Sequence, residues 1–283
     1  MRIGIIGKGF VGSAVEYGFT FEKNLNAEIK VFDINPKLKT HSLKDTINKS
    51  DYIFLSLPTP ANPDGTIHLD IVDNALAEID KSLNNDCIIL LRSTVVPGTS
   101  QLFAKKYPKL QLVFNPEFLT EKNANYDFIN QSRIILGGDK LLTEKVASLY
   151  NWRFDNSIPI IQTNYETAEF IKYVNNCFLA TKVSFMNEMK LIANQIDIDW
   201  DKTIEGFTLD PRVGNSHVSV PGHDGKYGFG GSCFPKDMQA LINFSESLNI
   251  DSKILKAAWD TNLKVRPEKD WETLEGRAVI DND

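Results

Sequence analysis

The sequence predicts an α/β fold in which an N-terminal, Rossmann-like, doubly wound parallel sheet is followed by an all-helical central domain with one long core helix. Seven short apolar runs alternate with helical stretches as far as residue 163, a pattern typical of strands that helices bury on both faces. From Tyr165, about thirty residues contain no glycine or proline and place apolar residues three and four apart, which predicts a single long helix.

The expected elements follow one another in a simple order. The strands are RIGIIG, IKVFD, YIFLSL, CIILLRS, LQLVFN, RIILGG and IPIIQT. After the long helix, further helices are expected around WDKTIEGF, from near Pro235, and over SKILKAAWDTNLKV, with a loop rich in glycine and proline from Asp210 to Gly231. We therefore expect an NAD-binding domain at 1–164, a helical domain at 165–265 and a tail at 266–283.

The net charge, the length of the apolar runs and the cysteine spacing limit which partners the protein is expected to bind. The 283 residues carry a net charge of −6, which gives no electrostatic footprint for nucleic acid or an anionic membrane. No apolar run approaches the roughly 18 to 20 residues that span a bilayer. The three cysteines, Cys87, Cys177 and Cys233, are widely spaced and fit neither a disulfide framework nor a metal motif. We expect a cytoplasmic protein without a metal, with small molecules or protein as partners.

A cofactor site is predicted at the first strand. GKGFVG matches the G-x-G-x-x-G pattern, follows a strand and opens a helix, and Asp33 ends the next strand. Asp33 would accept both ribose hydroxyls and repel a 2′-phosphate, so NAD is preferred to NADP. Its alternative role is to start the turn DINP. The expected cofactor contacts of the glycine turn are Gly7, Gly9, Phe10, Val11 and Gly12.

Other strand ends carry polar residues that can reach a ligand, because ligands of open α/β sheets bind beyond the carboxyl ends of the strands. Thr59, Ser93 and Thr94 are therefore expected near cofactor or substrate, although an ordinary turn or cap role fits each equally well. In NPEFLTE, two carboxylates, Glu117 and Glu121, stand four residues apart after another strand. Two solvated acids on a surface loop are the alternative.

The long helix and the last glycine-rich loop add further chemical groups. Lys172 and Asn176 share one helix face, although spacing alone favours a solvated lysine, and Cys177 is expected in the core. Cys233 differs, because it lies in GFGGSCFPKD between glycines and a helix start. Backbone N–H groups, the helix N-terminus and Lys236 would each favour its thiolate. A nucleophilic cysteine beside a nicotinamide can hold an aldehyde as a thiohemiacetal for a second oxidation.

Four motifs in order, GKGFVG, NPEFLTE, AEFIKYVNNCFLA and GFGGSCFPKD, resemble the UDP-glucose/GDP-mannose dehydrogenase family. The resemblance covers essentially the whole chain. It implies a four-electron oxidation of a sugar C6 hydroxyl to a carboxylate, UDP-glucose being the leading substrate, with two NAD⁺ per product. It also implies a homodimer formed through the long central helix.

The resemblance assigns roles by motif. Cys233 is similar to the family's nucleophile, Lys172 and Asn176 to the groups that stabilise an oxyanion, and Asp237 to the aspartate that assists them. Glu117 is similar to the acid/base that works with a water, and Thr94 to the threonine near that water. Lys236 and Glu121 are expected at the cofactor. The expected substrate contacts are Glu117, Phe118, Leu119, Glu121, Lys172, Asn176, Arg212 (across the dimer interface), Tyr227, Phe229 and Gly230.

Two departures from the family pattern stand out. Family enzymes usually continue into a second α/β domain that binds the nucleotide half of the substrate, whereas this chain stops at Asp283, so a separate partner supplying that domain is one alternative. The loop NSHVSVPGHDGKY is also longer than expected, and its His217 and His223 are expected at the surface.

Two other functions are open at this point. A two-electron β-hydroxyacid dehydrogenase shares a Rossmann domain, a helical domain and a helix lysine, but it has no use for Cys233. A non-catalytic NAD-binding subunit that supports a longer enzyme is the second alternative. The complete set of chemical groups argues against it.

Overall fold

The computed structural model describes residues 1–21 and 26–280, which form two compact units. The sheet unit comprises Met1–Thr59 and Leu69–Lys172, and the helical unit comprises Pro60–His68 and Tyr173–Asp283. The domain boundaries expected at residues 164 and 265 stay predictions, and the end of the expected tail, 281–283, lies outside the described residues.

The sheet unit contains one seven-stranded sheet of order β2-β1-β3-β4-β5-β6-β7. Each of the seven apolar runs forms one strand, which confirms the predicted α/β class. The strands are β1 (Arg2–Ile6), β2 (Glu28–Phe32), β3 (Tyr52–Leu55), β4 (Ile88–Leu91), β5 (Gln111–Phe114), β6 (Ile134–Gly138) and β7 (Ile160–Thr163).

One pairing departs from the expected parallel arrangement of the sheet. β6 runs antiparallel to β5, with Val113 opposite Gly138 and Phe114 opposite Gly137, while all other neighbours are parallel. A continuous apolar run reports that a strand is buried on both faces, but it carries no information about strand direction. The antiparallel direction of β6 could therefore not be predicted from its apolar run.

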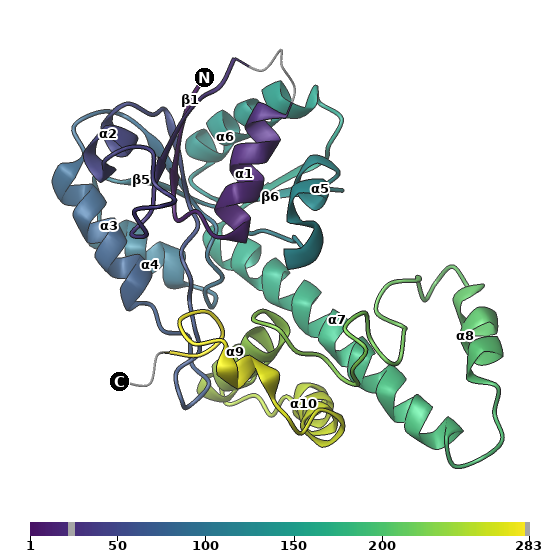
Figure 1. Ribbon diagram of the computed structural model, residues 1–283. Helices are drawn as coiled ribbons and strands as arrows, with labels where there is room; N and C mark the ends of the chain where they lie inside the picture. Colours follow the sequence, from purple (N-terminus) through teal and green to yellow (C-terminus); the bar gives the residue numbers. More distant parts are fainter. Residues whose placement is uncertain (22–25, 281–283) are drawn as a thin grey trace. The chain divides into compact units, whose positions relative to one another are not determined.

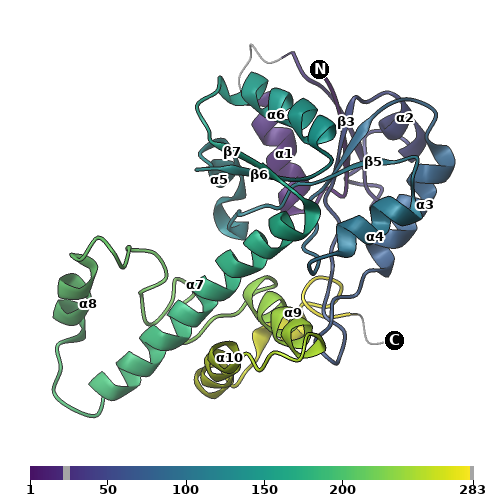
Figure 2. The same ribbon diagram turned by 180° about the vertical axis from the view of Figure 1, so that it is seen from behind.

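Helices cover both faces of the sheet (Figures 1 and 2). One face packs against α1 (Phe10–Thr20), α5 (Ala124–Ile129) and α6 (Lys140–Phe154), through a cluster that includes Phe19, Phe128 and Tyr150. The other face packs against α2 (Leu43–Asn48), α3 (Asp70–Ser82) and α4 (Thr99–Lys106), through a cluster that includes Ile47, Val72 and Phe103. Full burial of each such side chain stabilises the fold by about 1.5–3 kcal/mol.

The helical unit is built on the long helix that the sequence predicted, α7, which spans Tyr165–Ala193 and begins in the sheet unit. Ser184 of α7 donates to the Ala258 carbonyl of α10 at 2.6 Å, and Cys177 lies 3.6 Å from the Asp237 carbonyl of α9. The other elements of this unit are α8 (Trp200–Thr208), α9 (Phe234–Ser247), α10 (Lys253–Val265) and the 3₁₀ turn η2 (Asp270–Thr273).

The segment Pro60–His68 leaves the sheet unit and packs in the helical unit. Its Ala61 N–H donates to the Ala278 carbonyl at 2.8 Å, and the Ile280 N–H returns a bond to the Ala61 carbonyl at 3.1 Å. Asn243 of α9 donates to the Asp64 carbonyl at 2.9 Å. Residues 278–280 are thus held in place by pairing with a segment from the first quarter of the chain.

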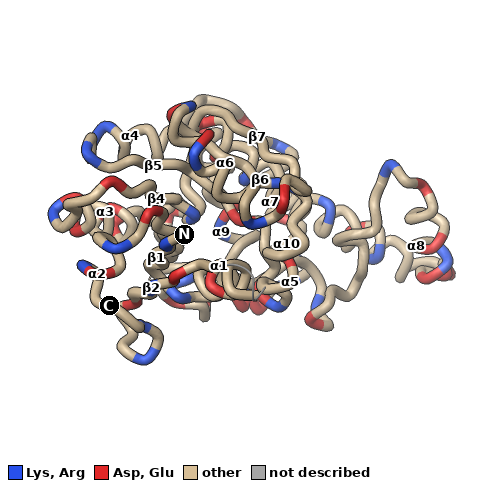
Figure 3. The backbone as a smooth tube through the Cα atoms, turned by 90° about the horizontal axis from the view of Figure 1, so that it is seen from above, with Lys and Arg blue, Asp and Glu red and all other residues tan. Residues whose placement is uncertain are grey.

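Charge is distributed evenly along the backbone. Figure 3 shows Lys and Arg interspersed with Asp and Glu over both units. Within residues 1–21 and 26–280, none of the helices combines the length and the apolar character needed to cross a bilayer.

A buried carboxylate joins α7 to the start of α4. Glu169 has no exposed surface, and its two oxygens accept from the backbone N–H groups of Gly98 and Ser100 at 2.6 and 2.7 Å. Burial raises the pKa of this carboxyl to about 7, although the hydrogen bonds from Ser100 and Gly98 oppose the rise. The native state therefore holds a proton that an unfolded glutamate releases near pH 4.5.

This raised pKa predicts a pH-dependent stability. Because the native state binds the extra proton, stability falls as pH rises from 4.5 through 7. Between pH 5 and 8, the free energy of unfolding of the wild type should fall by about 2–3 kcal/mol relative to Glu169→Gln. Urea unfolding across this range measures the difference. Glu144→Gln, an exposed change on α6, is the control, and parallel pH profiles for wild type and Glu169→Gln would refute the assignment.

Candidate active site

The glycine turn after β1 has the shape that a dinucleotide pyrophosphate needs. Gly7 adopts a φ of +88°, and a Cβ on Gly12 would lie 2.0 Å from the Gly7 carbonyl oxygen, so α1 packs against this turn only because residue 12 is glycine. Gly9 is the N-cap of α1, which has no side-chain cap, and no atom lies within 4 Å of a Cβ placed on it. The open space at Gly9 faces the positive end of the helix dipole.

Asp33 follows β2, as the sequence predicted. Its carboxylate accepts from the Lys8 N–H at 2.6 Å and from the Asn35 N–H at 2.8 Å, which orients it at the glycine turn. At the end of β3, the Ser56 hydroxyl is buried without a hydrogen-bond partner in the structure. An open helix N-terminus, an oriented acid and a hydroxyl without a partner fit a dinucleotide, while the cofactor contacts of the individual residues stay predictions.

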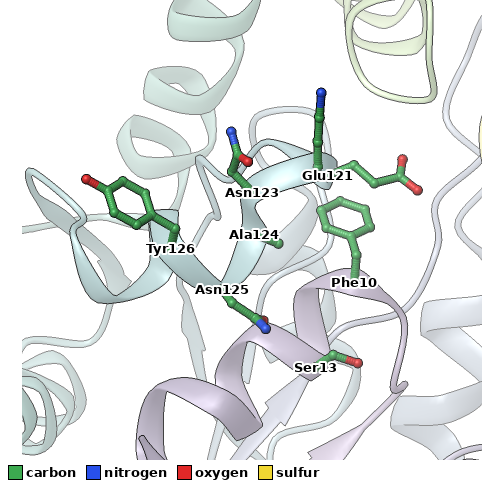
Figure 4. Close-up of a pocket in the computed structure, with 8 residues that line it drawn as sticks. Phe10, Ser13, Glu121, Asn123, Ala124, Asn125 and Tyr126 are labelled. Atoms are coloured by element: carbon green, nitrogen blue, oxygen red, sulfur yellow. The ribbon is translucent and has the colours of Figure 1, made fainter.

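A hollow of about 390 Å³ opens beside this turn. Figure 4 shows α1 on one side, with Phe10 and Ser13, and the 3₁₀ turn η1 (Glu121–Asn123) with α5 on the other. Two of the predicted cofactor residues, Phe10 and Glu121, therefore line one hollow although they are far apart in the sequence.

The hydroxyl groups at the ends of β3 and β4 bind each other's loops. Thr59 donates to the Thr94 carbonyl at 2.9 Å, and Ser93 donates to the Leu57 carbonyl at 2.7 Å. These bonds hold the SLPTP and RSTVVPG segments together. Thr59 and Ser93 thus have a structural role between loops, in place of the local turn or cap role considered for them, and a ligand contact of either residue or of Thr94 stays a prediction.

The segment NPEFLTE is a loop after β5, and it binds α7 through a buried ion pair. Lys172 is 2% exposed and Glu117 is 6% exposed, and the Lys172 ammonium lies 2.9 Å from a Glu117 carboxylate oxygen and 2.5 Å from the Glu117 carbonyl. The other Glu117 oxygen accepts from the Leu119 N–H at 2.7 Å. The interpretation of Lys172 as a solvated side chain was therefore wrong, because its spacing on the helix did not reveal a buried carboxylate partner.

Aromatic surface covers this ion pair. The Lys172 ammonium lies 5.3 Å from the centre of the Phe118 ring, and the Arg133 guanidinium lies 4.3 Å from the same ring. The two cations attract the face of the Phe118 ring and hold it in place, and the apolar ring shields part of the ion pair from water. A buried, paired carboxylate of this kind can transfer a proton within a low-dielectric site.

In the helical unit, a second polar set surrounds the first turn of α9. Asn176 of α7 donates to Asp237 at 2.7 Å, and Lys236 lies 2.6 Å from the other Asp237 oxygen. All three side chains are buried. Lys172 and Asn176 stand four residues apart on α7, so this helix contributes to both sets on one face.

Cys233 is the N-cap of α9, and Pro235 lies in the first turn, as expected. The three cysteines are all thiols, but only Cys233 is half-exposed. Burial raises the pKa of Cys87 to about 12 and raises the pKa of Cys177 as well, so neither supplies a thiolate near neutral pH. No three His, Cys, Asp or Glu side chains gather as a metal site within the described part of the chain.

The remaining substrate candidates lie in the loop before Cys233. Phe229 is buried, while Tyr227 and Gly230 are partly exposed. Arg212 is exposed and pairs with Asp210 two residues away. His223 is exposed, whereas His217 is half-buried against the Phe234 ring at 5.6 Å, which corrects its expected surface position.

Sequence reasoning missed a buried polar network behind the predicted site. Arg92 donates to the Asn115 side chain at 2.6 Å and to the Tyr150 hydroxyl at 3.2 Å, and Tyr150 bonds Asn115 in turn. This network fixes the ends of β4 and β5, from which RSTVVPG and NPEFLTE start. The signal was a polar residue directly after each of two apolar runs, which is easily taken for the start of a turn.

Comparisons with known proteins agree with these observations. Residues 16–152 match the NAD binding domain of the UDP-glucose/GDP-mannose dehydrogenase family, and residues 166–264 match the central domain of that family. The chain is 33% identical to a UDP-glucose 6-dehydrogenase of Rickettsia typhi, covering 94% of this chain and 68% of that protein. It thus spans about two thirds of the length of this relative.

Solved structures show the same relationship. A UDP-glucose dehydrogenase from Pyrobaculum islandicum superimposes with a TM-score of 0.81 at 29% identity, over 97% of this chain and 70% of that chain. A 3-hydroxyisobutyrate dehydrogenase from Mycobacterium tuberculosis has a TM-score of 0.73 at 14% identity, over 95% of this chain and 94% of that one, which shows a shared fold alone. By sequence and by structure, the chain belongs to the UDP-glucose/GDP-mannose dehydrogenase family, whose members use NAD.

Proposed function

We propose that the chain oxidises a nucleotide sugar, UDP-glucose before others, at C6 to the uronate in two successive two-electron steps. The half-exposed thiol of Cys233 at the start of α9 carries this proposal, because a simple alcohol oxidation has no use for a nucleophile. Three thiols without a disulfide favour a cytoplasmic site of action.

The first oxidation needs a base at the C6 hydroxyl and a positive group near its oxygen. Glu117 accepts the hydroxyl proton through a water, and the Lys172 ammonium stabilises the alkoxide as the aldehyde forms. NAD⁺, when bound, accepts the hydride from C6 in each of the two oxidations. Thr94 orients the water at Glu117.

The second oxidation needs the aldehyde to be held and to become a hydride donor again. The Cys233 sulfur attacks the aldehyde carbon, and the resulting oxyanion is stabilised by Lys172 and Asn176 until it is protonated. As hydride leaves this thiohemiacetal, Glu117 takes the hydroxyl proton through its water, and a thioester forms. Water, oriented by Asp237, then attacks the thioester carbon and loses a proton to Glu117. The C–S bond breaks, which returns the thiolate and releases the acid product, which ionises in solvent to the carboxylate.

Two alternatives make different demands on the same chain. A two-electron β-hydroxyacid dehydrogenase would release one NADH per product and would not need Cys233. A non-catalytic subunit, dependent on a partner for the nucleotide half of the substrate, would bind NAD⁺ without turnover. Substrate binding by Phe118, Leu119, Glu121, Tyr227, Phe229 and Gly230 belongs to the leading proposal alone.

A matched pair of glycine changes tests NAD binding at the turn after β1. Gly9→Ala places a methyl group in open space, so it should leave the fold intact but weaken NAD⁺ binding by roughly tenfold, about 1.4 kcal/mol. Gly12→Ala meets the Gly7 carbonyl, so it should lower the free energy of unfolding by about 1–3 kcal/mol. Calorimetric titration and thermal unfolding measure the two effects. Unchanged NAD⁺ affinity in Gly9→Ala would count against this site.

Product stoichiometry tests the reaction. The protein is mixed with NAD⁺ and a panel of nucleotide sugars, and NADH is measured by absorbance and the product by its mass. About two NADH should form per uronate. Cys233→Ser keeps the side-chain shape but lacks a competent nucleophile, so uronate formation should fall by about 10³-fold or more. Cys87→Ala, which changes a buried thiol directly before β4, should stay active. One NADH per product favours the two-electron alternative. No turnover despite NAD⁺ binding favours the partner-dependent subunit.

A homodimer through α7 is the proposed assembly, with Arg212 reaching a substrate across its interface. Five exposed apolar side chains lie within an arc of about 80° on this helix. They are Phe170, Val174, Phe178, Phe185 and Ile192. Thr181 and Glu188 lie in the same arc and interrupt the stripe. An exposed apolar stripe of this kind is typical of a surface that another protein covers.

A charge in the stripe should break this dimer. Phe178→Glu places a carboxylate at the most exposed aromatic position of α7, and it should raise the dimer dissociation constant by roughly tenfold or more. Ile254→Glu, an equally exposed position on α10, is the control. Sedimentation velocity distinguishes monomer from dimer, and dimers of equal strength in both variants would contradict an α7 interface.

A further inference from the structure

The glycine segment before Cys233 has an unusual number of buried polar partners. This segment, Gly228–Gly231, is called the glycine loop here, and its first and last residues adopt φ values of +69° and +72°. Its backbone has no regular pairing with a strand or helix, yet Gly228 and Phe229 are buried and Gly230 and Gly231 are only partly exposed. Its N–H and C=O groups therefore need side-chain partners.

Two asparagines satisfy the first half of the loop. Asn187 of α7 accepts from the Gly228 N–H at 2.9 Å. Asn262 of α10, which has no exposed surface, accepts from the Phe229 N–H at 2.7 Å and donates to the Phe229 carbonyl at 3.0 Å. The side-chain amide of Asn262 thus satisfies both backbone groups of Phe229, as a neighbouring strand would in a sheet.

A buried guanidinium holds the second half. Arg266, directly after α10, is 2% exposed, and it lies 2.6 Å from Asp270 and 2.7 Å from Asp224, with a further bond to the Tyr227 carbonyl at 3.3 Å. Asp270 also accepts from the Gly231 N–H. Arg266 is therefore bonded directly to the residue before the glycine loop and, through Asp270, to the last residue of the loop.

Glycine is required here because these side chains occupy the space of a Cβ. A Cβ on Gly228 would lie 2.4 Å from the side-chain oxygen of Asn262. A Cβ on Gly230 would lie 2.5 Å from a terminal nitrogen of Arg266 and 2.6 Å from Asp270. At these two positions, the glycines of GFGGSCFPKD make room for buried partners of the loop.

We propose that Arg266, with Asp270 and Asn262, positions Cys233 for nucleophilic attack by fixing the glycine loop two residues before it. The role of the thiol rests on the proposed function. Arg266 is a positioning residue, since it contacts the loop and not a reacting atom. Held in one conformation, the loop presents the thiol at the N-terminus of α9, where backbone N–H groups favour the thiolate.

Arg266 acts on Cys233 by fixing the geometry of the loop and not by stabilising the thiolate with its own positive charge. Arg266 carries one positive charge between two carboxylates, so the group as a whole is not cationic. On α9 itself, Lys236 is likewise paired with Asp237. Lysine at 266 keeps the charge but loses the planar fork that binds two carboxylates and a carbonyl at once. Arg266→Lys therefore separates geometry from charge.

Alkylation of Cys233 by iodoacetamide tests this proposal without substrate or cofactor. The rate is followed by peptide mass spectrometry across pH, and its midpoint reports thiolate formation independently of how exposed the sulfur is. Arg266→Lys and Asp270→Asn should each move the midpoint upward by about one pH unit, a roughly tenfold loss of thiolate below it. Lys264→Gln, an exposed change two residues before Arg266, should leave the midpoint in place.

Kinetics give a second readout. In the variants Arg266→Lys and Asp270→Asn, kcat should fall by about fivefold or more, while the dissociation constant of NAD⁺ changes little, because the displaced loop precedes the attacking group and contributes no proposed cofactor contact. A wild-type midpoint in both variants, whatever their melting temperature, would overturn the proposal. A shifted midpoint in a chain that shows no turnover would support the positioning role and count against the proposed function.

Discussion

Polar side chains of one unbroken helix, α7, bind the backbone of several loops that carry or precede candidate chemical groups of this protein. Loops at strand ends and helix starts leave backbone groups unpaired, and burying such a group without a partner costs about 1–3 kcal/mol. α7 supplies the missing partners. Its side chains bind the backbone of four separate segments through Glu169 at Gly98 and Ser100, Lys172 at Glu117, Lys182 at Val213, Gly214 and Ser216, and Asn187 at Gly228.

This arrangement explains why α7 contains neither glycine nor proline. A kink would rotate the residues beyond it and change which loops they reach. Glu169, Lys172 and Asn187 lie on one buried face of α7, where polar side chains are uncommon, whereas Lys182 is partly exposed and lies between this face and the apolar one. The opposite face carries the apolar stripe from Phe170 to Ile192. One face of the helix therefore binds loops of this chain, and the other is the proposed dimer interface.

Much of the fold was readable from the sequence, and much of the site was not. All seven strands and α7 follow from local periodicity, because burial on two faces or on one helical stripe selects apolar residues at fixed spacing. The direction of β6 and the burial of Lys172 depend on partners distant in the sequence, and local patterns do not record them. Cys233 was found because a cysteine among glycines is conspicuous, whereas Arg266 stands in a tail of weak periodicity.

The pairing of Ala61 with Ala278 and Ile280 has a consequence for synthesis on the ribosome. Chains emerge N-terminus first at about 5–20 residues per second, and domains form as their residues become available. The sheet can assemble once Lys172 has emerged, but Pro60–His68 must wait for its partner strand until Ile280 has been made. The helical unit therefore closes late, which delays ordering of the glycine loop and its cysteine until the sheet unit has formed.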